Sequence, residues 1–321
     1  MPELVNFDHS LKPKGTALVN EDHSKSLMMS QRNISPWVFI PARLGSRRLP
    51  RKPLLDLSGR PLIARVVEAV SAVVDPERIV VVSDTSDVLK ASQLADPQPG
   101  QTLIISDSCH SGSDRVRRAY LAHTTFALDA PAQGEWLINV QGDEPLLPPD
   151  SLRALINALP EFERQGIKIA TLAAPLPSPS HDILHDRAAV KACLSLPLSM
   201  TSMNIVDQVQ AQRNIVAQTK AQSNIIRATE HIREALYFTR APTGGHLHIG
   251  VYAYHSSILP LLATQRTPLS AQEDLEQLTW MEHGARIGVV CLTEPHPPGV
   301  DTPEDLLCVR RLYEAQHLAG V

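Results

Sequence analysis

Residues 37–53 read WVFIPARLGSRRLPRKP, an apolar run followed at once by a basic segment. The run Trp37–Ile40 predicts a short buried strand, which we expect Pro41 to end because proline donates no backbone hydrogen bond to a sheet. The loop that follows, residues 42–52, carries four arginines and a lysine. Such side chains neutralise and hydrogen-bond phosphate oxygens, and Gly45 lets the backbone approach them closely. The loop lacks G-x-x-x-x-G-K-[ST] and is therefore not a P-loop.

Outward from this stretch, strands alternate with amphipathic helices. We predict further strands at residues 79–82, 103–105 and 136–140, and helices at 61–74, 85–95 and 112–122. This alternation is typical of an α/β fold, a mostly parallel sheet covered by helices on both faces. In such folds ligands bind beyond the carboxyl ends of the strands. We therefore expect the four loops that leave these ends to converge on one site: residues 42–52, 83–85, 106–113 and 141–145.

The second half of the chain is less regular. It predicts strands at residues 169–174, 190–194, 247–254 and 287–292, and helices at 271–283 and 302–318. Asp301 or Thr302 is expected to cap the last helix. We expect these strands to form a smaller antiparallel lobe.

Two segments fall outside this pattern. Residues 1–35 are polar and predict a disordered tail, so that the catalytic domain spans residues 36–321. Around residues 200–230 the motif Asn-Ile-Val or Asn-Ile-Ile recurs at ten-residue spacing, which indicates a local duplication within an insert.

Composition excludes several classes of protein. The 321 residues carry a net charge of −4, whereas a general nucleic-acid binder presents a basic surface. The four cysteines form no C-x-x-C pair, so free thiols are expected. The chain has no apolar run near the roughly 18 residues of a spanning helix and no secretory signal. We therefore expect a cytoplasmic protein without membrane insertion or nucleic-acid partner.

Two acidic motifs follow. Residues 139–145 read NVQGDEP, and Asp143 at the end of an apolar strand is either a Mg²⁺ ligand or part of a polar turn. Residues 298–306 read PGVDTPEDL, in which Asp301 is either a functional carboxylate or a helix cap.

Together the basic loop and the two acidic motifs resemble those of the 3-deoxy-manno-octulosonate cytidylyltransferase (CMP-Kdo synthetase) family: P-A-R-x-x-S-x-R-L-P-x-K-P, N-V-Q-G-D-E-P and G-V-D-T-P-E-D-L, in this order. Shorter matches are SGSDR at 111–115, TLA at 171–173, AVK at 189–191, YFTRAP at 237–242, HIGVY at 248–252, and Glu273 with LEQL at 275–278. The resemblance spans residues 38–313, interrupted by the insert. It implies a nucleotide-diphospho-sugar transferase type of fold, a homodimer, and lipopolysaccharide synthesis as the pathway.

The resemblance also implies the reaction and its residues. The anomeric hydroxyl of Kdo would attack the α-phosphate of CTP and release pyrophosphate. Lys52, Arg43 and Asp143 would be catalytic, with Ser46 and Arg48 also on the triphosphate, and Asp143 and Asp301 would hold Mg²⁺. The remaining substrate contacts would come from Ser111, Gly112, Ser113, Arg115, Gln141, His248, Tyr252, Glu276 and Gln277.

The acceptor half departs from the family pattern. The loop after Pro242 is shortened, Cys109 replaces a common His, and Thr279 replaces a common Arg. Alternatives are therefore transfer to another acidic sugar, such as 8-amino-Kdo or a sialic acid, or a non-catalytic nucleotide-sugar-binding paralogue. A dinucleotide-dependent dehydrogenase is excluded, because no G-x-G-x-x-G follows the first strand.

Overall fold

The computed structural model describes residues 34–45, 48–105, 109–126, 134–176, 183, 185–198 and 231–318. The expected tail, apart from its last two residues, and the repeat motifs of the insert lie outside these residues. A single sheet of nine strands organises the described part, in the spatial order β5-β4-β1-β6-β10-β7-β11-β9-β8. In chain order the strands are β1 (Trp37–Ala42), β4 (Ile79–Ser83), β5 (Gln101–Ile104), β6 (Trp136–Asn139), β7 (Ile169–Pro175), β8 (Lys191–Leu194), β9 (Ile232–Thr239), β10 (His246–His255) and β11 (Ile287–Cys291).

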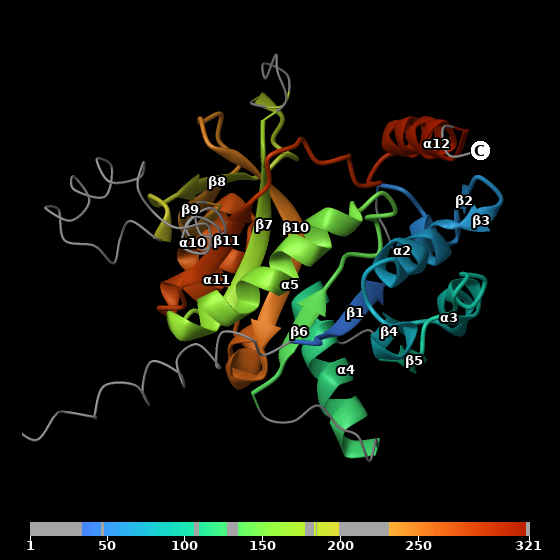
Figure 1. The fold of residues 1–321 in the computed structure, drawn as a ribbon, viewed down its shortest axis with the longest axis horizontal. Helices are drawn as coiled ribbons and strands as arrows, with labels where there is room; N and C mark the ends of the chain where they lie inside the picture. Colours follow the sequence, from blue (N-terminus) through green and yellow to red (C-terminus); the bar gives the residue numbers. More distant parts are fainter. Residues whose placement is uncertain are drawn as a thin grey trace, which may run out of the picture. The chain divides into compact units, whose positions relative to one another are not determined.

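The helices and a small hairpin surround this sheet (Figure 1). The α-helices are α2 (Leu62–Ser71), α3 (Ser86–Ser92), α4 (Gly112–Phe126), α5 (Pro149–Arg164), α10 (Pro268–Glu273), α11 (Glu276–Glu282) and α12 (Pro303–Leu318). Three 3₁₀ helices, η1 (Lys52–Leu54), η2 (Pro76–Arg78) and η3 (Ser256–Ala263), and the hairpin β2 (Asp56–Leu57) and β3 (Arg60–Pro61) complete the described elements. No helix in the described residues is apolar over the length needed to cross a membrane.

The mixed α/β fold is confirmed, whereas the second-half strands do not form a sheet of their own, and β7 and β11 among them are parallel neighbours. Strands β5, β4, β1 and β6 are parallel neighbours. Beyond them β10 runs antiparallel to both β6 and β7, and β8 and β9 pair antiparallel at the far end. The antiparallel strands of the second half thus extend the same sheet.

Apolar side chains project from both faces of the sheet, as expected for strands that are covered on two sides. On one face Val38 and Ile40 pack with buried residues of α2, α3 and α5. On the other, Phe39 belongs to a core with α4, η3 and α11. A third cluster lies under α12 and joins Leu57 and Leu62 to Val309 and Tyr313. Figure 1 accordingly shows α12 beside α2 and the β2–β3 hairpin, although α12 is far from both of these elements in the sequence.

Three details differ from the sequence predictions. Pro41 does not end β1, which continues to Ala42 opposite Ser83. The backbone N–H and C=O of Phe39 point toward β6, where the amide of Val140 donates to the Phe39 carbonyl. Because every second residue of a strand directs its backbone groups to the same neighbour, those of Pro41 also point toward β6. Pairing with β6 has ended there, so the missing N–H of Pro41 costs no ladder hydrogen bond.

The predicted helix 271–283 is also wrong as a single element. Asp274 adopts the left-handed conformation, with φ 54°, and divides it into α10 and α11. Helix α5 and strand β9 are not predicted at all. Helix α5 begins at Pro149 and contains Pro160, and an internal proline normally argues against a helix.

Candidate active site

The loops that leave the carboxyl ends of the parallel strands meet, as the sequence predicts. The amide of Leu44 donates to Asp84 Oδ1 at 3.2 Å, which ties the basic loop to the loop after β4. Gly142 packs against the end of β1 so closely that a Cβ there would lie 3.0 Å from the carbonyl oxygen of Pro41. The turn after β6 therefore needs a glycine to lie beside the basic loop.

Lys52 brings together the two aspartates that the sequence singled out. Its Nζ donates to Asp143 Oδ2 at 2.6 Å and to Asp301 Oδ1 at 2.9 Å. The second oxygen of Asp301 accepts from Arg48 at 2.7 Å. The Lys52 side chain is only 14% exposed, so its charge is partly shielded from water. This cluster joins a cation of the basic loop to both acidic motifs.

The sequence left open whether Asp301 caps α12, and the structure gives this role to Thr302. The hydroxyl of Thr302 accepts from the Asp305 amide, and the Asp305 carboxylate accepts from the Thr302 amide at 2.8 Å. This reciprocal pair is a capping box, with Asp in the place usually taken by Glu. The carboxylate of Asp301 is left to face Lys52 and Arg48.

Burial and charge pull the titration of this cluster in different directions. Although burial opposes its charge, Asp143 and Asp301 raise the pKa of Lys52. Against the effect of burial, hydrogen bonds and charges of Lys52 and Arg48 lower the pKa of Asp301. Burial raises the pKa of Asp143, and the negative charges of Glu144 and Asp301 add to this effect despite the opposing charge of Lys52. A carboxylate in this position gains from additional positive charge.

The donor set fits a hard divalent cation. One ammonium nitrogen reaches oxygens of both Asp143 and Asp301, so a single cation can be shared by these carboxylates. Among the described residues no group of three or more His, Cys, Asp or Glu side chains is arranged to hold a metal. Mg²⁺ commonly uses one or two protein carboxylates together with substrate phosphates, so a pair of carboxylates is compatible with such a site.

A second polar cluster lies at the start of α4. Ser111 and Ser113 donate to the two carboxylate oxygens of Glu276, at 2.5 and 2.9 Å. Ser113 Oγ also lies 2.9 Å from the hydroxyl of Tyr254. Burial raises the pKa of Glu276, in opposition to these two serine hydrogen bonds. The structure thus joins three of the predicted substrate-side residues in one network.

An aromatic wall adjoins this network. His248 and Tyr252 flank a β-bulge in β10, and their ring centroids are 5.3 Å apart. Tyr252 also packs edge-on to Trp280 at 5.3 Å. Burial lowers the pKa of His248 to about 3, so this half-buried imidazole is neutral. Its Nε2 lies 3.2 Å from Thr171 Oγ1.

The remaining predicted residues are placed as follows. Arg43 is exposed on the basic loop, and Ser46 lies outside the described residues. Gly112 and Gln141 are neighbours, since a Cβ on Gly112 would lie 3.6 Å from Gln141 Oε1. Arg115 and Gln277 are buried, and the guanidinium of Arg115 donates to the carbonyl of Ile105.

Sequence reasoning missed several residues that support the site. His296 Nε2 lies 3.2 Å from Glu144 Oε2, next to Asp143. The hydroxyl of Thr171 donates to the Val251 carbonyl at the bulge. The carboxylate of Asp84 accepts from the backbone amide of Leu44. Thr171 lay within a matched motif, whereas no spacing in the sequence indicates the other two contacts.

Comparison with known proteins gives consistent relatives. A family model described as cytidylyltransferase matches residues 37–287. A 3-deoxy-manno-octulosonate cytidylyltransferase from Anaeromyxobacter sp. (strain Fw109-5) is 32% identical over 87% of this chain and 96% of its own. The same-named proteins from Polynucleobacter necessarius subsp. necessarius (strain STIR1) and Bradyrhizobium sp. (strain ORS 278) are each 34% identical, over 86% of this chain and 94% and 96% of theirs. The solved structure of a CMP:2-keto-3-deoxy-manno-octonic acid synthetase complexed with CTP aligns with a TM-score of 0.65 and 26% identity, over 88% of this chain and 99% of that one.

Proposed function

Because the chain belongs to the 3-deoxy-manno-octulosonate cytidylyltransferase family, we propose that it transfers CMP from CTP to Kdo (3-deoxy-D-manno-octulosonate). The anomeric hydroxyl of the sugar attacks the α-phosphate, the bond to the β-phosphate breaks, and pyrophosphate leaves. The product is CMP-Kdo, an activated sugar for lipopolysaccharide synthesis.

The observation that carries this proposal is the meeting of Lys52 with Asp143 and Asp301 at the ends of the parallel strands. Lys52, Arg43, Ser46 and Arg48 bind the triphosphate, and Lys52 neutralises charge that develops at the α-phosphate. Asp143 and Asp301 hold Mg²⁺. When bound, this ion supplies polarisation of the phosphate and a lower pKa of the attacking hydroxyl.

The acceptor binds at the serine–glutamate network and the aromatic wall. The backbone N–H groups at Gly112 and Ser113 open α4 and can receive the sugar carboxylate, because a helix N-terminus favours an anion. Arg115 adds positive charge behind them. Hydroxyl groups of the sugar are bound by the remaining predicted residues: Ser111, Gln141, His248, Tyr252, Glu276 and Gln277.

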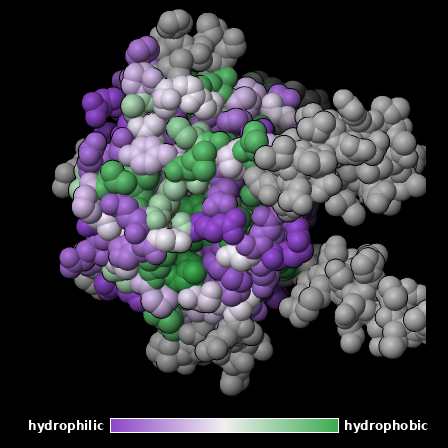
Figure 2. Space-filling model, turned by 90° about the vertical axis from the view of Figure 1, so that its left-hand side faces the viewer, coloured by the Kyte–Doolittle hydropathy of each residue, from purple (hydrophilic) through white to green (hydrophobic). Residues whose placement is uncertain are grey.

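The protein is proposed to act in the cytoplasm as a homodimer. Support for a dimer comes from the β8–β9 end of the sheet, where Leu196 and Leu236 are 63% and 62% exposed. Figure 2 views the molecule from this side, and apolar groups gather there among hydrophilic ones. A contiguous apolar patch at this end would favour an interface, and the homodimer itself is proposed from the resemblance to the family. Light scattering after gel filtration measures the oligomeric state directly.

The function is tested by pyrophosphate release with Mg²⁺ and each of the four ribonucleoside triphosphates, with and without Kdo. Release that requires both CTP and Kdo supports the proposal. If CTP binds but Kdo elicits no release, 8-amino-Kdo and sialic acids are tested as acceptors. Release with one of these would identify a different acidic sugar, and no release with any of them would favour a non-catalytic paralogue.

A further inference from the structure

The two proposed metal ligands reach the site from unrelated parts of the chain. Asp143 follows β6, whereas Asp301 follows a long irregular segment after β11. A metal shared by two carboxylates requires that their separation be fixed before the ion arrives. Lys52 contacts both side chains, and contacts between the segment before α12 and the turn after β6 are needed in addition to fix the two backbones.

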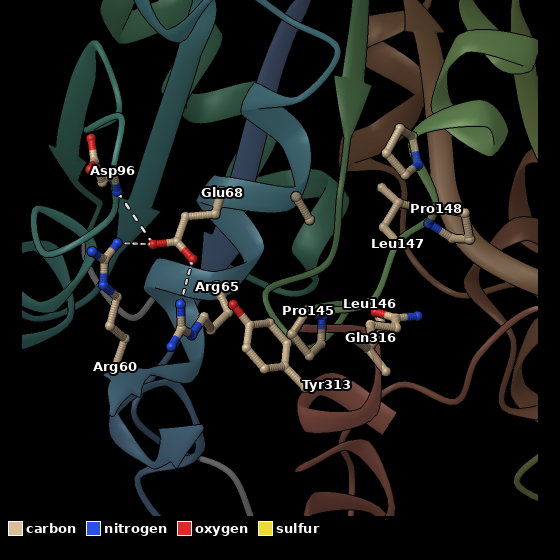
Figure 3. A pocket seen from close by; sticks show the side chains of 12 residues that line it. Arg60, Arg65, Glu68, Asp96, Pro145, Leu146, Leu147, Pro148, Tyr313 and Gln316 are labelled. Carbon is tan, nitrogen blue, oxygen red and sulfur yellow. Dashed lines mark hydrogen bonds and ion pairs between the residues drawn. The ribbon is translucent and has the colours of Figure 1, made fainter. Parts of the chain in front are cut away.

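Packing of α12 supports this segment in part, because Val309 shares a buried apolar cluster with Val300 and Leu146. A pocket of about 750 Å³ opens between α12, α2 and residues 145–149 (Figure 3). In the lining of this pocket the guanidinium of Arg65 stacks over the ring of Tyr313, 4.5 Å from the ring centroid, in a cation–π contact. Arg60 and Arg65 both form salt bridges with Glu68. Tyr313 lies several turns of α12 from Asp301, so the contacts beside this pocket act on the far end of the helix.

The turn and the segment are joined directly beside the aspartates. The amide of Val300 donates to the Asp143 carbonyl at 2.9 Å, and Val300 is fully buried. Gly299 lies against the same turn, since a Cβ there would be 3.3 Å from the Asp143 carbonyl oxygen and 3.4 Å from Glu144 Oε1. The backbone at residue 299 thus lies in close contact with the turn, and a Cβ there would require a small shift of its neighbours.

One side-chain pair completes this junction. His296 Nε2 lies 3.2 Å from Glu144 Oε2, and the two side chains are only 5% and 13% exposed. The other ring nitrogen of His296, Nδ1, is buried without a hydrogen-bond partner among the described residues. Placing an imidazole here therefore leaves one buried polar atom without a hydrogen bond among the described residues, which is unfavourable. The contact with Glu144 provides a partner for the other ring nitrogen, Nε2.

We infer that His296 and Glu144 are positioning residues, which set the separation of Asp143 and Asp301 for a shared divalent cation. Neither touches the reacting atoms. Both act through the backbone, Glu144 on the neighbouring Asp143 and His296 on the segment that ends in Asp301. The inference rests on the proposed metal role of the two aspartates.

Two conservative variants of His296 provide a matched test. In His296→Gln the amide nitrogen can take the place of Nε2 and keep the contact with Glu144. In His296→Asn the shorter amide can replace only Nδ1, which has no partner to keep. His185→Gln, at an exposed position away from the junction, serves as the control.

Binding of Mn²⁺, followed by electron paramagnetic resonance in the presence of CTP and without Kdo, is the primary measurement. We expect His296→Asn to weaken Mn²⁺ binding by about 10-fold or more, the usual effect of losing a partner of a metal ligand. His296→Gln should stay within about threefold of wild type, and KM for Kdo should change little in either variant. Glu144→Gln, whose side-chain oxygen can still accept from Nε2 of His296, should resemble His296→Gln.

Equal Mn²⁺ affinity in His296→Asn and wild type would overturn the inference, as would equal weakening in both His296 variants when both fold. If His296→Asn does not fold, Glu144→Ala removes the same contact from the other side, and unchanged Mn²⁺ affinity in that variant overturns the inference. Because these titrations contain no Kdo, they decide the matter even if wild type fails to form CMP-Kdo. That failure would refute the proposed function and leave the positioning result standing.

Discussion

The ammonium nitrogen of Lys52 lies 2.6 Å from a carboxylate oxygen of Asp143, although 91 residues separate the two in the chain. Asp143 lies in the turn after β6, and Lys52 begins η1 at the end of the basic loop that follows the adjacent parallel strand β1. The contact therefore depends on the path of this loop as well as on the order of strands in the sheet. In the proposed mechanism the pair combines a positive charge for a phosphate with a negative charge for a metal. Such opposed charges within one small space are typical of phosphoryl-transfer sites.

Replacing Lys52 by Ala should abolish measurable turnover. The substitution removes the cation proposed to stabilise charge at the α-phosphate, and loss of one such group lowers kcat by about 10²–10³-fold or more. Pyrophosphate release at saturating CTP and Kdo measures the effect. Near-normal activity of the purified variant would remove Lys52 from the catalytic assignment.

Asp143→Ala should also abolish turnover, and Asp143→Asn tests the charge alone. In Asp143→Asn the ammonium of Lys52 keeps Asp301 as a partner, so the fold should survive while metal binding is lost. Asp150→Asn is the matched control, because that side chain is 96% exposed and paired only locally with Arg153. Activity of Asp143→Asn that recovers fully at saturating Mg²⁺ would argue that Asp143 is not a required ligand.

Glu276→Gln should act on the acceptor and not on the nucleotide. The carboxylate organises Ser111 and Ser113 at the start of α4, and an amide of the same size cannot accept from both hydroxyls through two equivalent oxygens. We expect KM for Kdo to rise by about 10-fold, equivalent to about 1.4 kcal/mol, with KM for CTP within about twofold. An equal rise in both constants would contradict this separation of the two half-sites.

His248 should make the protein less stable as the pH falls. In the unfolded chain a histidine takes up a proton near pH 6.5, whereas burial lowers the pKa of the folded His248 to about 3. The unfolded state thus binds more protons between these values, and stability is lost as the pH drops through this window. Between about pH 6.5 and about pH 5 the loss should reach up to about 2 kcal/mol.

Urea unfolding of wild type and His248→Gln at both pH values measures the part of this loss of stability that is due to His248. The variant should lose less stability on acidification than wild type, while His185→Gln, at an exposed position, should behave as wild type. The same acid loss in His248→Gln and wild type would show that the imidazole is not responsible.

Deletion of residues 204–222 should leave activity within about twofold of wild type. Strands β8 and β9 on either side are hydrogen-bonded antiparallel neighbours, so a shorter connection can join them. Surface connections usually tolerate such changes in length. Steady-state kinetics with CTP and Kdo measure the outcome, and a large loss in a folded variant would give the insert a role in the site.

The sequence predicted the strands and the meeting of their loops because buried parallel strands carry strong local signals. Trp37–Ile40 and Ile79–Val82 are continuous apolar runs, and both form central strands. The capping box of α12 joins residues only three positions apart, so a short sequence motif was enough to indicate it. Only Asp301's partners, which come from the other end of the chain, separated its site role from a cap.

Long-range and conformational features were not predictable in this way. The pair of His296 and Glu144 joins residues 152 positions apart, and neither residue type indicates the contact. Asp274 divides a helical pattern through its left-handed backbone, which periodicity does not reveal. In α5, packing of Leu152, Leu155 and Phe162 against the sheet outweighs the cost of Pro160.

The position of β10 in the sheet governs the order in which the chain can assemble. It lies between β6 and β7 and also pairs with β8, yet it is among the last strands to leave the ribosome. Until then β6 presents an unpaired edge to the crowded cell interior, and such an edge can recruit other chains. A nascent chain that stops short of residue 246 therefore lacks the strand that joins its two halves, and chaperones have most to protect during that interval.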